Sequence, residues 1–181
     1  CLSRGLGDVY KRQEPYVAFG EWDNQPSPRV EQLRAAFAHA GVAVEIPADI
    51  HVALWEKFLF LAAFSGVTAV TRAPAGVVRA LDPTRALLNG VMREIALVAQ
   101  ARGIALPATA VETAMSAVDA LPPHGTASMQ RDILAGRPSE LEAQTGAVVR
   151  LGTDAGVPTL INAFIYAALL PQEMAARGLT V

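Results

Sequence analysis

One lysine in this chain lies within a strongly apolar stretch. Lys57 falls in the run 54–61, which is otherwise mostly hydrophobic, and at helical spacing it shares a side with Leu61, Ser65 and Thr68. An ammonium group in partly desolvated surroundings has a lowered pKa and can donate a proton near neutral pH. The alternative is a lysine that lays its stem over apolar surface and keeps its charge in water. A single lysine does not decide between the two.

A serine and two glutamates further along the chain could act together with this lysine. Ser128 precedes a short apolar-periodic segment, where a serine either caps a helix or contacts an anion. Ser139 and Glu142 have the S-x-x-E spacing of a capping box, so Glu142 is expected to accept the backbone N–H of Ser139. Glu140 lies beside this cap, where it either compensates the helix dipole or contacts a substrate hydroxyl.

Metal and phosphate sites have little support in the sequence. The only cysteine is Cys1, which excludes an internal disulfide and a cysteine-based metal site. The histidines His39, His51 and His124 have no partner at helical spacing, so no metal is expected. No G-x-G-x-x-G turn follows a predicted strand, so a dinucleotide cradle is not expected within this chain.

Composition limits the class of protein. Hydrophobic residues make up 52% and charged residues 18% of the 181 positions, which is enough for a packed core. The net charge is −2 and no run of Lys or Arg occurs, so neither nucleic acid nor an anionic membrane is an expected partner. The apolar runs 58–70 and 159–170 are shorter than the about 20 residues that span a bilayer. They are predicted to be core helices of a cytoplasmic protein.

The hydrophobic periodicity changes near residue 47. Before it, the pattern predicts a strand over 16–20, a helix over 28–40 and a strand over 42–46. After it, only about six helices are predicted. The first is capped by Asp49, runs to about Val70 and is broken at 72–76. The second runs from Asp82 to Gly103, the third follows Pro107, and the fourth is short and stops at Gly136. The fifth runs from the capping box to about Ala155 and the sixth from Leu160 to Pro171, with a short amphipathic tail after it.

These elements predict three segments. Residues 1–13 have the character of translated linker and are predicted to be non-native, with a short native loop as the alternative. Residues 14–48 form a strand–helix–strand piece too small for a core of its own, predicted to be the end of a truncated nucleotide-binding domain. Residues 49–181 are predicted to be a helical domain.

Three motifs, taken in order, resemble one known family. They are Trp55-x-Lys57-Phe58, Ser128-Met129-x-x-Asp132-Ile133, and Ser139-Glu140 followed by an aliphatic and an acidic residue. The ordered set is similar to the C-terminal domain of ketopantoate reductase (2-dehydropantoate 2-reductase) over residues 16–181. The resemblance implies a mainly α, multi-helix domain of the 6-phosphogluconate dehydrogenase C-terminal-like type, preceded by a short β-α-β remnant of a Rossmann-type domain.

The resemblance also implies roles for individual residues. In that family the lysine that matches Lys57 protonates the ketone oxygen while NADPH delivers hydride to the carbon. The serine that matches Ser128 holds the substrate carboxylate, and the glutamate that matches Glu140 contacts the substrate hydroxyl. The implied protein is an NADP-dependent, homodimeric oxidoreductase of pantothenate biosynthesis. Its NADP is bound mainly by a missing N-terminal domain, so the fragment alone is expected to be inactive.

Several positions depart from the family pattern. Leu61 and Ser65 stand where many members carry asparagines, and Gly125 replaces another polar residue. A familiar Thr-Pro near the last helix is Thr-Leu here, although Asn162 matches. The implied substrate pocket is therefore less polar than in typical members.

Two alternatives to ketopantoate reduction follow. One is a reductase of the same superfamily that acts on another 2-oxo acid. The other, from a different class, is a stand-alone helical interaction module in which Lys57 and Glu140 are ordinary surface charges.

Overall fold

The computed structural model describes residues 16–179, and the chain divides into two compact units. The first unit ends at Leu54 and the second begins at Trp55. The boundary falls inside one long helix, α2 (Ile50–Thr71). The predicted linker at residues 1–13 lies outside the described residues.

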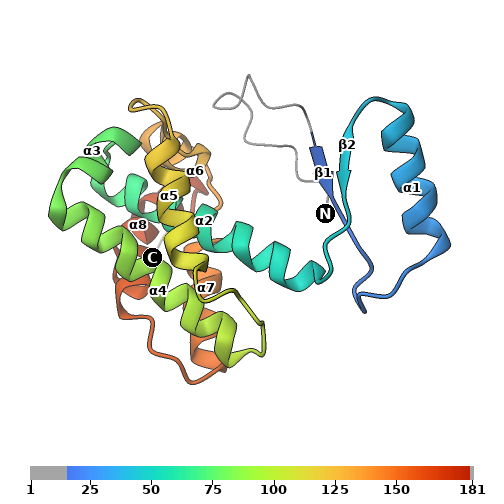
Figure 1. The fold of residues 1–181 in the computed structure, drawn as a ribbon. Coiled ribbons are helices and arrows are strands. Elements are labelled where there is room, and N and C mark those ends of the chain that lie inside the picture. The colour runs from blue at the N-terminus through green and yellow to red at the C-terminus, as the bar shows by residue number, and fades with distance from the viewer. Residues whose placement is uncertain (1–15, 180–181) are drawn as a thin grey trace. The chain divides into compact units, whose positions relative to one another are not determined.

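The first unit is a small β-α-β arrangement (Figure 1). Its elements are β1 (Tyr16–Ala18), α1 (Pro28–His39) and β2 (Ala43–Glu45). The two strands pair in parallel, with Val17 opposite Val44, and α1 connects them as a crossover helix. The Ser27 side chain caps α1 by accepting the Val30 N–H at 3.2 Å. The three predicted elements are confirmed, and both strands are shorter than expected.

The segment between β1 and α1 packs on the start of α2. Asn24 Oδ1 accepts the Ile50 N–H at 2.9 Å, and the rings of Trp22 and His51 lie edge to face with centroids 4.4 Å apart. Asp49 Oδ1 accepts the His51 N–H at 2.8 Å, which is the geometry of an N-cap. The sequence-based assignment of Asp49 as the cap of this helix is confirmed.

The core of the first unit is small. Among its described residues only Val30 and Ile50 are buried hydrophobic side chains. Large apolar side chains remain exposed there, namely Tyr16, Trp22, Leu33 and Ile46. Two short strands and one helix bury too little apolar surface to be stable alone, in agreement with the expectation from the sequence.

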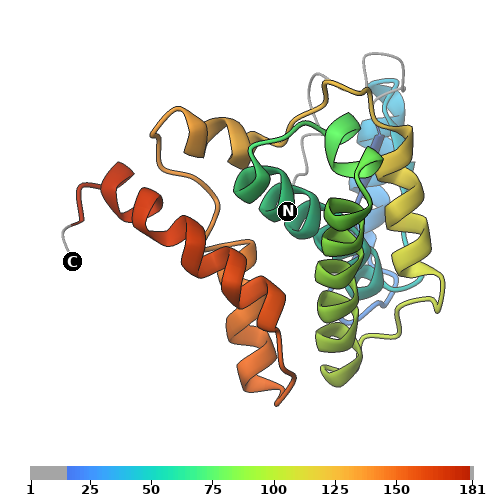
Figure 2. The ribbon, with the colours of Figure 1, turned by 90° about the vertical axis from the view of Figure 1, so that its left-hand side faces the viewer.

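The second unit contains only helices among its described residues (Figures 1 and 2). After α2 come α3 (Ala75–Ala80), α4 (Asp82–Ala101), α5 (Ala110–Ala120), α6 (Ser128–Leu134), α7 (Thr145–Asp154) and α8 (Leu160–Ala176). α8 packs against α7 and α4, and α4 also packs against α3 and α5. Large, fully buried side chains from these helices and from a connecting turn form the core, including Leu59, Leu88, Met92, Ile95, Met129, Leu141 and Ile165.

A glycine lets α2 approach α7 and α8 closely. A Cβ atom on Gly66 would lie 3.3 Å from Thr145 Oγ1 and 3.4 Å from Ile165 Cγ2. A glycine costs about 1 kcal/mol relative to alanine inside a helix. Here the missing side chain makes room for the packing of three helices.

α2 meets the simple criterion for a membrane span. It has 22 residues and is long and apolar enough to cross a bilayer. The sequence-based check compared only the apolar run 58–70 with the thickness of a bilayer, whereas the whole helix from Ile50 meets the criterion. Residues 62–69 are all buried inside the second unit, and buried core helices pass the same criterion. The burial favours a core helix.

One helix was not predicted. The segment 72–76 was expected only to break the chain, yet α3 starts within it, so the described part has seven helices after residue 49. Arg72 takes a left-handed conformation (φ 56°) that ends α2. The Pro74 carbonyl then accepts the N–H groups of Val77 and Val78 at 3.0 and 3.1 Å. The breaking residues therefore also start the next helix.

The last helix does not stop at Pro171. Its predicted end was wrong because α8 continues to Ala176 with Pro171 inside it. A proline in a helix leaves the carbonyl four residues earlier without its usual donor. That carbonyl belongs to Ala167, which is exposed and can bond water instead. Glu173 and Arg177 form an ion pair at 2.7 Å that holds the final turn.

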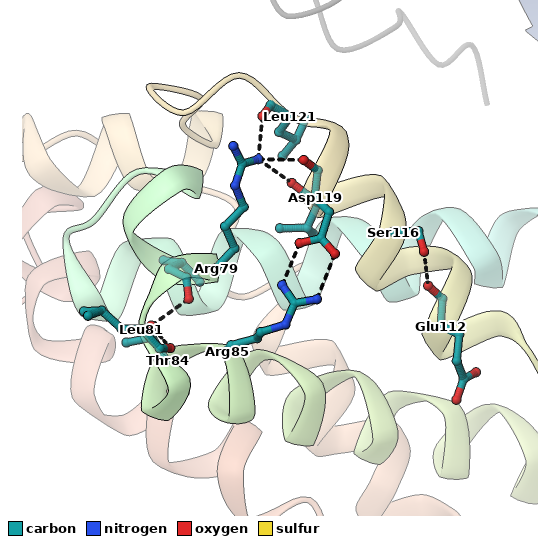
Figure 3. Close-up of polar contacts among 10 residues, drawn as sticks. Arg79, Leu81, Thr84, Arg85, Glu112, Ser116, Asp119 and Leu121 are labelled. Carbon is teal, nitrogen blue, oxygen red and sulfur yellow. Dashed lines mark hydrogen bonds and ion pairs between the residues drawn. The ribbon is translucent and has the colours of Figure 1, made fainter.

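Two arginines hold the C-terminal end of α5 (Figure 3). Arg79 Nη1 donates to the carbonyl oxygens of Val118, Asp119 and Leu121 at 3.2, 2.8 and 2.6 Å. Arg85 makes two bonds to the Asp119 carboxylate at 2.6 and 2.8 Å. A cation at a helix C-terminus satisfies free carbonyls and favours the helix dipole. This cluster fixes α5 against α3 and α4.

A carboxylate from another helix caps the N-terminus of α8. Glu94 on α4 accepts the N–H groups of Ile161 and Asn162 at 2.8 and 2.9 Å, through one oxygen each. It also accepts the Asn162 side-chain amide at 2.7 Å. The capping group therefore comes from a residue on α4 and not from the residues just before α8.

We expect Glu94→Ala to lower the free energy of unfolding by about 1–2 kcal/mol, because the α8 cap is lost. Urea unfolding followed by circular dichroism measures this change. The matched control is Glu112→Ala, which removes an exposed glutamate from α5 and should change stability by no more than about 0.5 kcal/mol. Equal midpoints for the two variants would contradict the cap.

Candidate functional site

The three predicted site residues lie on three different elements of the second unit. Lys57 is on α2, Ser128 is the first residue of α6, and Glu140 lies in the segment between α6 and α7. All three side chains are exposed. Among the described residues no ion pair joins Lys57 to Glu140. Each is therefore available to a ligand, and none is held by another.

Lys57 combines exposure with apolar surroundings. The rings of its neighbours Trp55 and Phe58 meet edge to face, with centroids 5.5 Å apart. Although the side chain as a whole is exposed, partial burial lowers the pKa of the Lys57 ammonium below its ordinary value of 10.5. Desolvation disfavours the charged form. This direction is the one that a proton donor requires.

The helix face that carries Lys57 runs from the surface into the core. Leu61 is half-buried, while Ser65 and Thr68 are buried. The Thr68 hydroxyl donates to the carbonyl of Phe64 at 2.7 Å, so its hydrogen bond is used within α2. Lys57 is thus the one residue of this predicted stripe that is exposed.

Ser128 does not cap α6. The helix starts at Ser128 itself, the cap position belongs to Ala127, and no side-chain capping bond is made. The alternative that Ser128 caps the helix is therefore wrong. Its hydroxyl is exposed and makes no capping bond. Gln130 on the same helix is buried and donates to the Ala73 carbonyl at 3.2 Å. This bond fixes α6 next to the end of α2.

The predicted capping box is not formed. α7 begins at Thr145, so Ser139 and Glu142 lie before it rather than at its start. Ser139 Oγ accepts the Leu141 N–H at 3.2 Å, but its own N–H goes to Glu173 at 3.0 Å. The S-x-x-E pattern failed because Leu141 is fully buried and residues 141–144 form turns around it.

Glu142 instead bridges α7 and α8. It accepts the Tyr166 hydroxyl at 2.7 Å and pairs with Arg150. The hydrogen bond to Glu142, assisted by burial and by the negative charge of Glu142, raises the pKa of Tyr166 above its ordinary value of 10. Glu142 therefore has a structural role, as expected, through a contact that was not expected.

We expect Glu142→Ala to lower the pKa of Tyr166 towards its ordinary value, because the acceptor and the charge that favour the neutral phenol are removed. Tyrosinate absorbance over a pH titration measures this, with Tyr166→Phe to assign the signal among the three tyrosines. Glu140→Ala is the control, since Glu140 contacts Gln144 and not the tyrosine. An unchanged titration in Glu142→Ala would contradict the contact.

Glu140 itself is exposed and lightly held. Its Oε2 accepts the Gln144 side-chain amide at 2.8 Å, and its carbonyl accepts the Gln144 N–H at 2.9 Å. One side-chain hydrogen bond leaves the carboxylate with unused acceptor positions. It can therefore accept a hydroxyl from a ligand.

Glu173 was not among the residues predicted from the sequence. This glutamate is buried in α8, with 4% of its surface exposed. It accepts both the N–H and the hydroxyl of Ser139, the residue before Glu140. A signal existed, because Glu173 continues the buried stripe of Ile165 and Leu169 at a spacing of four residues. The predicted end at Pro171 concealed it.

A surface depression of about 560 Å³ between α4 and α5 contains none of the predicted residues. Arg85 and Asp119 at its edge are paired with each other (Figure 3). We assign this depression to the structural cluster that holds α5.

Comparison with known proteins identifies the family of this chain. The family model described as ketopantoate reductase PanE/ApbA C terminal matches residues 49–173. A 2-dehydropantoate 2-reductase from Caulobacter vibrioides is 30% identical over 149 residues, which are 82% of this chain and 51% of that protein. The chain spans about half the length of the curated relatives it matches.

Solved structures show the same fold. The PanE/ApbA family ketopantoate reductase from Ralstonia eutropha JMP134 superimposes with a TM-score of 0.81 at 26% identity, over 92% of this chain and 54% of that one. A ketopantoate reductase from Staphylococcus aureus, described as dimeric, gives 0.79 at 22% identity, over 90% and 55%. The match over more than half of the chain confirms the resemblance seen in the motifs. The chain belongs to the ketopantoate reductase family, and its residues 49–173 match the C-terminal domain of that family.

Proposed function

We propose that this chain is the substrate-binding part of an NADPH-dependent reductase that converts the ketone of 2-dehydropantoate to an alcohol, in the pantothenate pathway of the cytoplasm. The observation that carries the proposal is that Lys57 is exposed and has a lowered pKa. The resemblance of the motif around it implies that this lysine matches the proton donor of the family. Family membership favours an oxidoreductase over a stand-alone interaction module.

The nucleotide is expected to bind mainly outside this chain. No G-x-G-x-x-G turn follows a strand here, so these residues do not fit a pyrophosphate cradle. The small core of the first unit supports the proposal that residues 14–48 end a larger nucleotide-binding domain. The cofactor would supply hydride to the carbonyl carbon of the substrate. By itself, the 181-residue chain is expected to be inactive.

The residues of this chain would bind the substrate and supply the proton. As negative charge develops on the ketone oxygen, the Lys57 ammonium would stabilise it and transfer a proton to it. The Ser128 hydroxyl would donate to the substrate carboxylate. Glu140 would accept the hydroxyl of the substrate and so orient its ketone towards the lysine.

Three positions near the proposed site bear on which 2-oxo acid is the substrate. Leu61 and Ser65 occupy usually polar family positions on α2, and Ser65 is buried. Gly125 is also buried and donates its N–H to the Pro122 carbonyl at 2.8 Å within a tight turn. A pocket with fewer polar groups supports a different 2-oxo acid as the alternative substrate. Turnover measured across a panel of 2-oxo acids decides between them.

We expect Lys57→Ala, in the protein that also carries the nucleotide-binding domain, to lower turnover by about two to four orders of magnitude. The loss should fall on kcat more than on cofactor affinity, because the lysine acts as the charge develops. Lys57→Arg should not restore turnover, since a guanidinium is a poor acid near neutral pH.

A pH profile provides the control. Lys57 must be protonated to act, so the wild-type rate should fall on the alkaline side at a pH below the ordinary lysine pKa of 10.5. Arg93→Ala, which removes an exposed cation from α4, should leave the profile unchanged. Near-wild-type turnover of a folded Lys57→Ala protein would end the catalytic assignment.

We further propose that the protein is a homodimer that uses one face of α8. Leu160 and Phe164 are 76% and 69% exposed there, one helical turn apart. The exposed Ala167 and Ala168 continue the same face, and small residues beside a large ring suit helix packing.

We expect Phe164→Asp to convert the dimer to a monomer, because it places a charge in the apolar contact. Light scattering after size-exclusion chromatography measures the mass. Leu97→Asp is the matched control, since Leu97 is 52% exposed on α4 outside this face. A Phe164→Asp protein that remains dimeric would contradict the proposed interface.

A further inference from the structure

A buried carboxylate holds the segment that carries Glu140. Glu173 Oε1 and Oε2 accept the Ser139 N–H at 3.0 and 3.1 Å, and Oε2 also accepts the Ser139 hydroxyl at 2.6 Å. Glu173 has 4% of its surface exposed. Ser139 immediately precedes Glu140, so these bonds fix the peptide from which the Glu140 side chain projects.

An arginine completes the hold on the same residue. Arg177, one helical turn after Glu173, donates through Nε to Glu173 at 2.7 Å and through Nη2 to the Ser139 carbonyl at 2.9 Å. The N–H, the hydroxyl and the carbonyl of Ser139 are therefore all bonded by two side chains, one from α8 and one from its C-cap residue. The backbone there can neither shift nor rotate without breaking several of these bonds.

Burying the charged carboxylate of Glu173 costs free energy unless its contacts compensate. Burial opposes the charged form, yet the bonds from Ser139 and Arg177 more than offset it and lower the pKa of Glu173. Well-packed apolar residues often stabilise a core as well as a buried ion pair does. Helix packing alone does not need this arrangement, whereas exact placement of a backbone segment does.

We propose that Glu173 and Arg177 are positioning residues that set Glu140 against the substrate hydroxyl. The inference rests on the proposed function and goes beyond it, because neither residue is expected to touch the substrate. Among residues 16–179, only the Gln144 amide bonds the Glu140 carboxylate, so the orientation of this side chain depends on the backbone that carries it. A displacement of about 1 Å at a reacting group can cost about a hundredfold in rate.

The test is substrate discrimination in the full-length enzyme. Rates are compared for 2-dehydropantoate and for 3,3-dimethyl-2-oxobutanoate, the same acid without the hydroxyl. A substrate contact at Glu140 favours the first, and Glu140→Ala should reduce the ratio of their kcat/KM values. We expect Glu173→Gln to reduce this ratio by about tenfold or more, and to add little in combination with Glu140→Ala.

A second variant and a matched control separate positioning from loss of folding. Arg177→Met keeps an unbranched, flexible side chain at this exposed position and removes the guanidinium. It should reduce the ratio of kcat/KM values, and it provides a second test if Glu173→Gln fails to fold. Glu94→Ala removes another carboxylate that holds α8 but lies away from Ser139, and it should leave the ratio unchanged.

The possible outcomes are distinct. An unchanged ratio in folded Glu173→Gln and Arg177→Met, with a reduced ratio in Glu140→Ala, overturns the positioning role and leaves the proposed function standing. A wild-type enzyme that does not prefer the hydroxylated acid, or a Glu140→Ala variant with the wild-type ratio, overturns the proposed contact of Glu140 instead.

Discussion

The helical unit depends on how α8 is fixed, and two carboxylates fix it. Glu94 holds its first turn from α4, and Glu173 ties its last turns to Ser139. Both are charge-assisted hydrogen bonds to backbone N–H groups, which are stronger than neutral ones. The Glu173 contact also sets the position of Ser139, in the segment that leads from α6 to α7.

Each predicted functional residue likewise lies on an element that long-range contacts hold in place. Lys57, Ser128 and Glu140 are exposed, yet each projects from an element that is anchored in the core. Gly66 lets the buried part of α2 pack against α7 and α8. Gln130 bonds α6 to Ala73, two residues after the end of α2. Glu173 bonds Ser139, the residue before Glu140. Rigid supports of this kind preorganise side chains that a ligand must meet.

The first unit differs from the second in kind. It has two short parallel strands, one helix and few buried side chains, whereas the second has a continuous core. Parallel strands are normally covered on both faces. This contrast is consistent with a chain that spans about half the length of its curated relatives, and it supports the proposal that catalysis requires a further domain.

The sequence alone determined the fold class, the family, the β-α-β start, the cap at Asp49 and most helices, because periodicity, caps and ordered motifs are local. It misplaced the start of α7, missed α3 and ended α8 early at Pro171. The start of α7 was misplaced because a distant group outweighs the local signal: Ser139 bonds Glu173, 34 residues away, rather than Glu142. Only the tertiary structure decided which carboxylate is buried, since long-range hydrogen bonds leave no spacing pattern that a sequence window can detect.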